Sequence, residues 1–168
     1  MDAPPINPAA DLAKSKLVIN IMLVSTFVVM LNETAMNVAI PRLMEALSVP
    51  ATDAQWLTAA FLLTMAVVIP ITGFLLQRLN TRPVFILAMS IFSAGTLVCA
   101  IAPGLELLVL GRVIQATGTA IMMPLLMTTI MTLVPPEARG KTMGNISIVM
   151  SVAPALGPTV GGLILSYL

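Results

Sequence analysis

The residue best suited to do chemistry in this sequence is a carboxylate inside an apolar segment. Glu33 lies within residues 31–41, which read LNETAMNVAIP and also carry two amides and a threonine. The segment around it, residues 17–40, has 24 mostly apolar residues, enough at ~1.5 Å per residue to cross a bilayer. An ionisable group in a spanning helix is costly and usually faces a cavity or a partner. We therefore expect Glu33 to lie on the path of a substrate or a proton.

A basic residue, Arg112, lies inside a second apolar segment at the same expected depth. Glu33 precedes Pro41 by eight residues, and Arg112 follows Gly104 by eight residues. If Pro41 and Gly104 mark the same membrane boundary, both charges lie ~12 Å below it. Equal depth allows a direct or water-bridged interaction between the carboxylate and the guanidinium.

Polar residues share a helical face with each of these charges. Thr26 and Asn37 lie seven residues before and four residues after Glu33, and Gln115 lies three residues after Arg112. Two opposing polar faces are expected to line a cavity. The competing interpretation is a buried Glu–Arg pair that only fixes helix packing, with the flanking amides and threonine as interhelical hydrogen-bonding groups. We favour the cavity, because an apolar pair would pack at a lower cost.

The composition indicates that the chain lies in a membrane, and it argues against several functions. With 58% hydrophobic and 9% charged residues and a mean hydropathy of +1.04, the chain is expected to be an integral membrane protein. A net charge of +1, with charges at segment ends, indicates no nucleic-acid partner. One cysteine, Cys99, and no histidine leave almost no ligands for a metal, so neither a metal nor another cofactor is expected. No segment of the sequence contains a paired nucleophile and base, so an enzyme is not expected.

Hydrophobic patterning predicts an all-α, polytopic transmembrane bundle. The five spanning helices are expected at residues 17–40, 55–76, 83–102, 105–134 and 142–168. A polar tail is expected at residues 1–16, before the first helix. Pro41 should end that helix, with an interfacial turn of helix following and a cap at Thr52 or Asp53. Pro124 should bend the fourth helix, and a charged turn should occupy residues 135–141.

Basic residues predict how the chain lies in the membrane. If the N-terminus is cytoplasmic, the outside turns carry only Arg42. The cytoplasmic side then carries Lys14, Lys16, Arg78, Arg82, Arg139 and Lys141. Because basic residues concentrate on the cytoplasmic side of membrane proteins, this bias predicts a cytoplasmic N-terminus.

Four segments resemble motifs of the major facilitator superfamily, specifically its multidrug:proton antiporters of the fourteen-helix type. Residues 31–41 resemble the helix 1 motif L-D-x-T-x-x-N-x-A-x-P, and residues 73–82, GFLLQRLNTR, are similar to G-x-L-a-D-R-x-G-r-[KR]. Residues 110–118, LGRVIQATG, resemble the helix 4 motif with R-x-x-Q-G-x-G. Residues 157–162, GPTVGG, match the G-P-x-x-G-G core of the antiporter motif. The resemblance covers the chain from about residue 17 onward.

The resemblance implies roles for particular residues. Arg112 would be the membrane-embedded arginine linked to proton coupling. The cytoplasmic gate motif would comprise Gly73, Gln77, Arg78 and Arg82. The flexible antiporter segment would comprise Gly157, Pro158, Gly161 and Gly162.

Two motif carboxylates differ in this sequence. The helix 1 aspartate is Asn32, and the carboxylate stands one position later at Glu33, which is a rotation of about 100° on a helix. The aspartate of the cytoplasmic turn is Gln77, and its glycine is Asn80. Gln77 can make hydrogen bonds but brings no charge to them.

The resemblance implies proton-coupled efflux of small amphipathic or drug-like compounds by alternating access, in the cell (plasma) membrane. The expected proton-coupling and substrate cavity comprises Glu33, Arg112, Asn37, Asn32, Gln115 and Thr26. The expected partners are a small-molecule substrate, protons and the lipid bilayer. Two alternatives remain: a transporter of another solute, such as a sugar or an organic acid, and a non-transporting membrane subunit or remnant.

Five helices would form most of the family's N-terminal domain, which has six, and a whole transporter has two such domains. Alternating access needs a second repeat to move against. The chain is therefore expected to need the missing C-terminal helices or another subunit. We favour a fragment of a longer protein.

Overall fold

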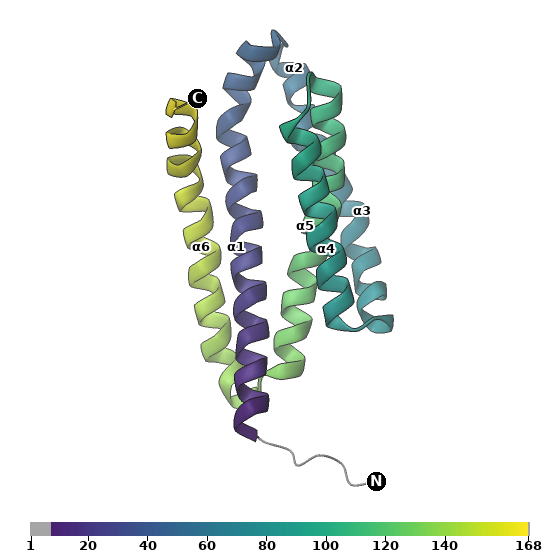
Figure 1. Cartoon of the computed structure of the whole chain (residues 1–168), viewed down its shortest axis with the longest axis vertical. Coiled ribbons are helices and arrows are strands. Elements are labelled where there is room, and N and C mark those ends of the chain that lie inside the picture. Colours follow the sequence, from purple (N-terminus) through teal and green to yellow (C-terminus); the bar gives the residue numbers. More distant parts are fainter. Residues whose placement is uncertain (1–7, 168) are drawn as a thin grey trace.

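Six helices, five of them long, make up the described part of the chain. The computed structural model describes residues 8–167, and its elements are α1 (Pro8–Leu47), α2 (Ala51–Ala54), α3 (Trp56–Arg78), α4 (Thr81–Ala100), α5 (Leu105–Leu133) and α6 (Pro136–Tyr167) (Figure 1). Within these residues, five helical spans are long and apolar enough to cross a membrane. The predicted all-α transmembrane bundle is confirmed.

The first helix is longer at both ends than the sequence predicts. It begins at Pro8, so the expected tail at residues 1–16 is wrong for residues 8–16, and residues 1–7 lie outside the described part. Proline suits the first turn of a helix, because its missing N–H would have no partner there. The expectation that Pro41 ends the helix is also wrong, since Pro41 lies inside α1.

Pro41 is tolerated because it removes only one backbone bond. The carbonyl that loses its donor four residues earlier belongs to Asn37, whose side chain is exposed. The helix instead ends at Leu47, and the next residue, Ser48, has a φ of 52° and donates its N–H to the Glu45 carbonyl at 3.3 Å. This left-handed residue closes α1.

Two other turns are shorter than expected. The predicted cap at Thr52 or Asp53 is wrong, because both lie inside α2 and its N-cap is Pro50. The predicted charged turn at residues 135–141 is also wrong, because α6 already begins at Pro136. Arg139 fixes this turn by donating from Nη2 to the Met131 carbonyl at 2.8 Å and from Nε to the Val134 carbonyl at 3.1 Å. A basic side chain thereby satisfies carbonyls at the end of α5.

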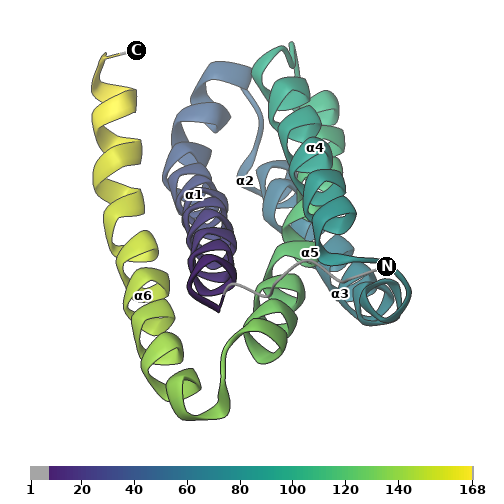
Figure 2. The same ribbon diagram turned by 60° about the horizontal axis from the view of Figure 1, so that its bottom comes forward.

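The helices form two groups that meet along α1 and α5. Helix α6 runs beside α1, and α3 and α4 pack on α5 (Figures 1 and 2). We call these the α1–α6 pair and the α3–α4–α5 group. Contact between α1 and α5 is less extensive than contact within either group. Helix α5 is the central element, since most residues of its apolar span are buried.

Glycines let α4 and α5 approach closely. A Cβ atom added at Gly95 would collide with the backbone of Gln115, and one at Gly111 would collide with Cys99. At Gly118 it would meet the backbone of Ala88 and Phe92. Small residues of this kind allow helix backbones to pack tightly in a membrane. The close packing brings the polar residues of α4 within reach of those on α5.

Candidate functional site

Arg112 lies at the centre of the α3–α4–α5 group, where its side chain is only 2% exposed. Its Nε donates to the backbone carbonyl of Leu57 at 3.4 Å, and its Nη1 donates to the side-chain oxygen of Gln115 at 2.6 Å. The guanidinium carbon lies 4.0 Å from the centre of the Phe61 ring, a cation–π contact. Helices α3 and α5 therefore hold the charge in a fixed orientation.

Gln115 connects Arg112 to two further helices. Its Nε2 donates to the Asn32 side-chain oxygen on α1 at 2.9 Å and to the Thr96 hydroxyl on α4 at 2.9 Å. Both N–H groups of the amide are thus used, and its oxygen faces the guanidinium. In the described part of the chain, no buried side-chain nitrogen or oxygen lacks a hydrogen-bond partner. We call Arg112, Gln115, Asn32 and Thr96 the arginine network.

Glu33 lies near this network without joining it. Its side chain is half-buried and interacts electrostatically with Arg112. Among the described residues, its carboxylate makes neither a hydrogen bond nor an ion pair. The direct Glu33–Arg112 contact that equal depth allowed is therefore not formed, because the guanidinium is turned toward Gln115, Leu57 and Phe61. The motif position itself, Asn32, makes the link to α5.

The other two residues expected on the Glu33 face lie in different surroundings. Thr26 is buried, and its hydroxyl donates to the Met22 carbonyl of the same helix at 2.8 Å. Its polar group is thus satisfied within α1. Asn37 is exposed on the surface of α1. An accessible amide and a half-buried carboxylate therefore lie one turn apart on this helix.

The antiporter motif divides into two pairs of residues. Gly157 and Gly161 are buried. A Cβ added at Gly157 would collide with the Thr34 side chain, and one added at Gly161 would lie tightly, 3.2 Å from the Cα atom of Ala35. Pro158 and Gly162 are exposed, and nothing lies within 4 Å of a Cβ added at Gly162. The two buried glycines thus set the distance between α6 and the polar stretch of α1.

The residues of the predicted gate motif lie at the opposite end of the helices from the arginine network. Gly73, Gln77, Arg78 and Arg82 are all exposed. Arg78 stacks on the Phe74 ring of its own helix, with 4.7 Å between the guanidinium carbon and the ring centre. The three α3 residues and Arg82 flank the α3–α4 turn. Arg82 also lines a cavity.

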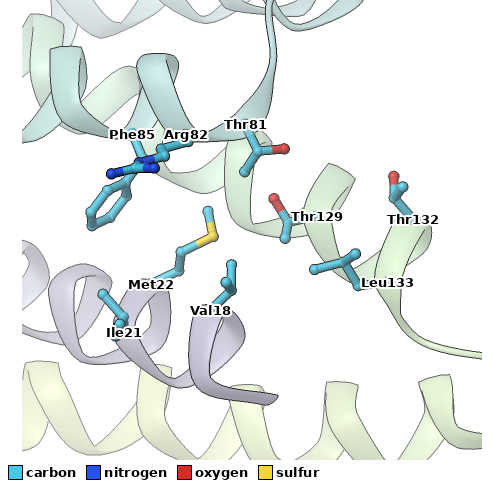
Figure 3. A pocket seen from close by; sticks show the side chains of 9 residues that line it. All are labelled: Val18, Ile21, Met22, Thr81, Arg82, Phe85, Thr129, Thr132 and Leu133. Carbon is cyan, nitrogen blue, oxygen red and sulfur yellow. The ribbon is translucent and has the colours of Figure 1, made fainter. Parts of the chain in front are cut away.

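That cavity is a largely apolar cleft of about 400 Å³ between α1, α4 and α5 (Figure 3). Its lining comprises Val18, Ile21, Met22, Thr81, Arg82, Phe85, Thr129, Thr132 and Leu133. A smaller hollow of about 190 Å³ lies beside Asn32 and Gly161, between α1 and α6. The described residues contain no cluster of three or more His, Cys, Asp or Glu side chains that could hold a metal.

Three residues of the site, Leu57, Phe61 and Thr96, were not predicted from the sequence. Leu57 contributes a backbone carbonyl, and Phe61 contributes a ring in an ordinary apolar segment, so neither has a sequence signature. Thr96 has an indirect one, because it follows Gly95, which allows α4 to approach α5 closely. A threonine beside a glycine in a spanning helix is a reasonable candidate for an interhelical hydrogen bond.

Most of the chain is similar in sequence to known proteins. The family profile of the Major Facilitator Superfamily matches residues 22–168. The uncharacterized MFS-type transporter YcnB of Bacillus subtilis is 47% identical over 87% of this chain and 31% of the relative. The lincomycin resistance protein LmrB of Listeria monocytogenes is 42% identical over 87% of this chain and 31% of its own length.

A third relative is more distant. The putative multidrug resistance protein MdtD of Klebsiella pneumoniae is 34% identical over 84% of this chain and 30% of its own length. The chain therefore spans less than a third of the length of these three curated relatives.

Proposed function

Because this chain belongs to the Major Facilitator Superfamily, we propose that it supplies the N-terminal helices of a proton-coupled exporter of small amphipathic or drug-like compounds. Relatives named for lincomycin and multidrug resistance support this substrate class. The chain spans about 31% of the length of YcnB. We therefore use the term complete transporter for this chain together with the further helices or the subunit that it needs.

The observation that carries the proposal is a fixed charge beside a carboxylate that is free to bind a proton. Arg112 is buried and held by two hydrogen bonds and an aromatic ring. Glu33 is half-buried, interacts electrostatically with Arg112 and has no hydrogen-bond partner among the described residues. A proton and the cationic group of a substrate can therefore compete for the same carboxylate. Such competition couples the export of one to the uptake of the other.

The proposed movement is that of the α1–α6 pair against other parts of the complete transporter. Alternating access places the substrate near the middle of the membrane and exposes it to each side in turn. On α1, Glu33 is half-buried and Asn37 is exposed, and the proposed substrate contacts these two side chains. Pro154 and Pro158 each remove a backbone bond from α6, which allows it to bend.

We propose that the protein lies in the cell membrane with its N-terminus on the cytoplasmic side. The start of α1, the α3–α4 turn and the start of α6 lie at the same end of the molecule (Figure 1). These segments carry six of the eight basic residues, and such an excess is typical of the cytoplasmic side. The gate motif then faces the cytoplasm, and Glu33 lies nearer the outside.

Transport by the complete transporter in liposomes tests the function. The probe is ethidium, a lipophilic cation, and an imposed pH gradient is the only driving force. We expect ethidium to accumulate on the more acidic side and protons to move in the opposite direction. Both fluxes should stop when an ionophore collapses the gradient. Ethidium flux that ignores the gradient would overturn proton coupling, and proton flux driven only by a sugar or an organic acid would identify another solute. No substrate-dependent flux of any kind would support a non-transporting subunit.

A further inference from the structure

We propose that Thr96 is a positioning residue for Arg112, acting through the Gln115 side chain. This inference rests on the proposed function, because it assumes that the orientation of Arg112 matters for transport. Thr96 is absent from the four motifs and lies on α4, away from both charges in the sequence. Its role follows from the direction of the hydrogen bonds that surround the Gln115 amide.

The Thr96 hydroxyl can only accept from Gln115. It donates its own hydrogen to the Phe92 carbonyl of α4 at 2.9 Å, so its oxygen is left to accept. The Gln115 Nε2 donates to that oxygen at 2.9 Å, and its second hydrogen goes to the Asn32 side-chain oxygen at 2.9 Å. Two acceptors on one side of the amide thus fix where the nitrogen lies.

Fixing the amide nitrogen also fixes the amide oxygen. The Gln115 oxygen then faces Arg112 and accepts from its Nη1 at 2.6 Å. A flipped amide would instead place two N–H groups against a guanidinium, which has donors only. Thr96 and Asn32 together therefore keep an acceptor, rather than a donor, in front of the buried charge.

Close packing of α4 and α5 makes this arrangement feasible. Gly95 precedes Thr96, and any larger side chain there would collide with the Gln115 backbone. The short distance between the helices lets a short threonine side chain reach the glutamine. Glu33 and Cys99 are the titratable groups that act electrostatically on Arg112. Neither forms a hydrogen bond with Gln115 among the described residues.

The test compares Thr96→Val, which keeps the shape but loses the hydroxyl, with Thr96→Ser, which keeps the hydroxyl. Thr72→Val is the matched control, because the buried Thr72 hydroxyl donates only to the Val68 carbonyl of its own helix. In the complete transporter, we expect Thr96→Val to lower the maximal rate of proton-coupled ethidium transport about tenfold, with little change in KM. The Thr96→Ser variant should keep most of the wild-type rate, and the Thr72→Val variant should keep all of it.

A Gln115→Ala background shows whether Thr96 acts through the amide. There, adding Thr96→Val should cause no further loss, because the amide that Thr96 orients is gone. An equal loss of rate in both backgrounds would overturn the proposal. An unchanged rate in Thr96→Val would also overturn it, as would a Thr96→Ser variant that is no better than Thr96→Val.

A second measurement does not depend on transport. Phenylglyoxal modifies accessible arginines, and mass spectrometry reports the modification rate at Arg112. We expect slow modification in the wild type, Thr96→Ser and Thr72→Val, and modification about tenfold faster in Thr96→Val because the guanidinium loses its fixed partner. Equal rates in all four proteins would overturn the proposal. If the wild type shows no proton-coupled transport, the proposed function fails while the modification rates still decide the role of Thr96.

Discussion

The two groups of helices hold their polar residues in opposite ways. In the α3–α4–α5 group, Arg112 is 2% exposed, and its donors bond to a backbone carbonyl and to an amide that is itself fixed. In the α1–α6 pair, Glu33 is half-buried and Asn37 is exposed, with no hydrogen bond to hold either side chain among the described residues. One group therefore presents a fixed positive charge, and the other a carboxylate that remains accessible.

The backbones of the two groups differ in the same sense. Glycines on both α4 and α5 allow tight packing along their contact. Between α1 and α6, the glycines lie on α6 only. Prolines do not distinguish the groups, because α3 and α5 contain Pro70 and Pro124 just as α1 and α6 contain Pro41, Pro154 and Pro158. Close packing of α4 on α5 thus supplies a rigid support for the charge that must stay in place. The α1–α6 pair, in which only one helix has glycines, carries the group that must meet a proton or a substrate.

The largest effect is expected where the rigid group depends on a glycine. Gly95→Leu should prevent α4 from packing on α5, because its side chain would collide with the Gln115 backbone. We expect loss of monodisperse protein in size-exclusion chromatography after expression. Gly144→Leu is the control, since nothing lies within 4 Å of a Cβ added there. A well-folded Gly95→Leu protein would contradict the rigid packing described for this group.

An intermediate effect is expected in the α1–α6 pair. Gly157→Leu should force α6 away from Thr34, at a cost of about 1–3 kcal/mol. We expect a lower melting temperature in detergent, with the protein still folded, and partial recovery when Thr34→Ala makes room. Gly162→Leu belongs to the same motif and should melt like the wild type. If Gly162→Leu destabilises as much as Gly157→Leu, contact with α1 is not what the buried glycine provides.

The smallest effect is expected at the bond between the two groups. Among the described residues, Asn32 makes the one side-chain hydrogen bond between α1 and α5, to Gln115. Asn32→Ala removes this bond and should cost about 0.5–1.5 kcal/mol, as for an ordinary neutral hydrogen bond. Asn32→Asp keeps an acceptor and should be more stable than Asn32→Ala in a thermal melt. A loss larger than that of Gly157→Leu would mean that the two groups are joined more firmly than their contacts indicate.

Much of the fold could be predicted from the sequence, because five long apolar segments between polar turns have few other solutions in a membrane. The helix ends were harder to place. Pro41 and Pro136 act as breakers in a simple pattern, yet a proline costs little in the first turn of a helix and is tolerated inside a membrane-spanning helix. That is why α1 passes through Pro41 and α6 begins at Pro136.

The candidate site could be predicted in part. An arginine and a glutamine three residues apart in an apolar helix already indicate a buried polar network. The direction of each side chain depends on helix packing, which the sequence does not contain. Asn32, rather than Glu33, therefore contacts Gln115, and Thr96 completes the set of acceptors. A threonine that bonds its own helix, such as Thr26, has the same local sequence signal as one that also reaches a neighbour.

The central claim is that Glu33 binds the transported proton while Arg112 stays fixed. The most direct measurement is the release of protons from the complete transporter in weakly buffered detergent solution when ethidium is added to saturation. The wild type should release protons on binding, and Glu33→Gln should release none. Glu45→Gln, which changes an exposed carboxylate on the same helix in the same way, should release as many protons as the wild type. Undiminished proton release from a folded Glu33→Gln protein that still binds ethidium would contradict the account.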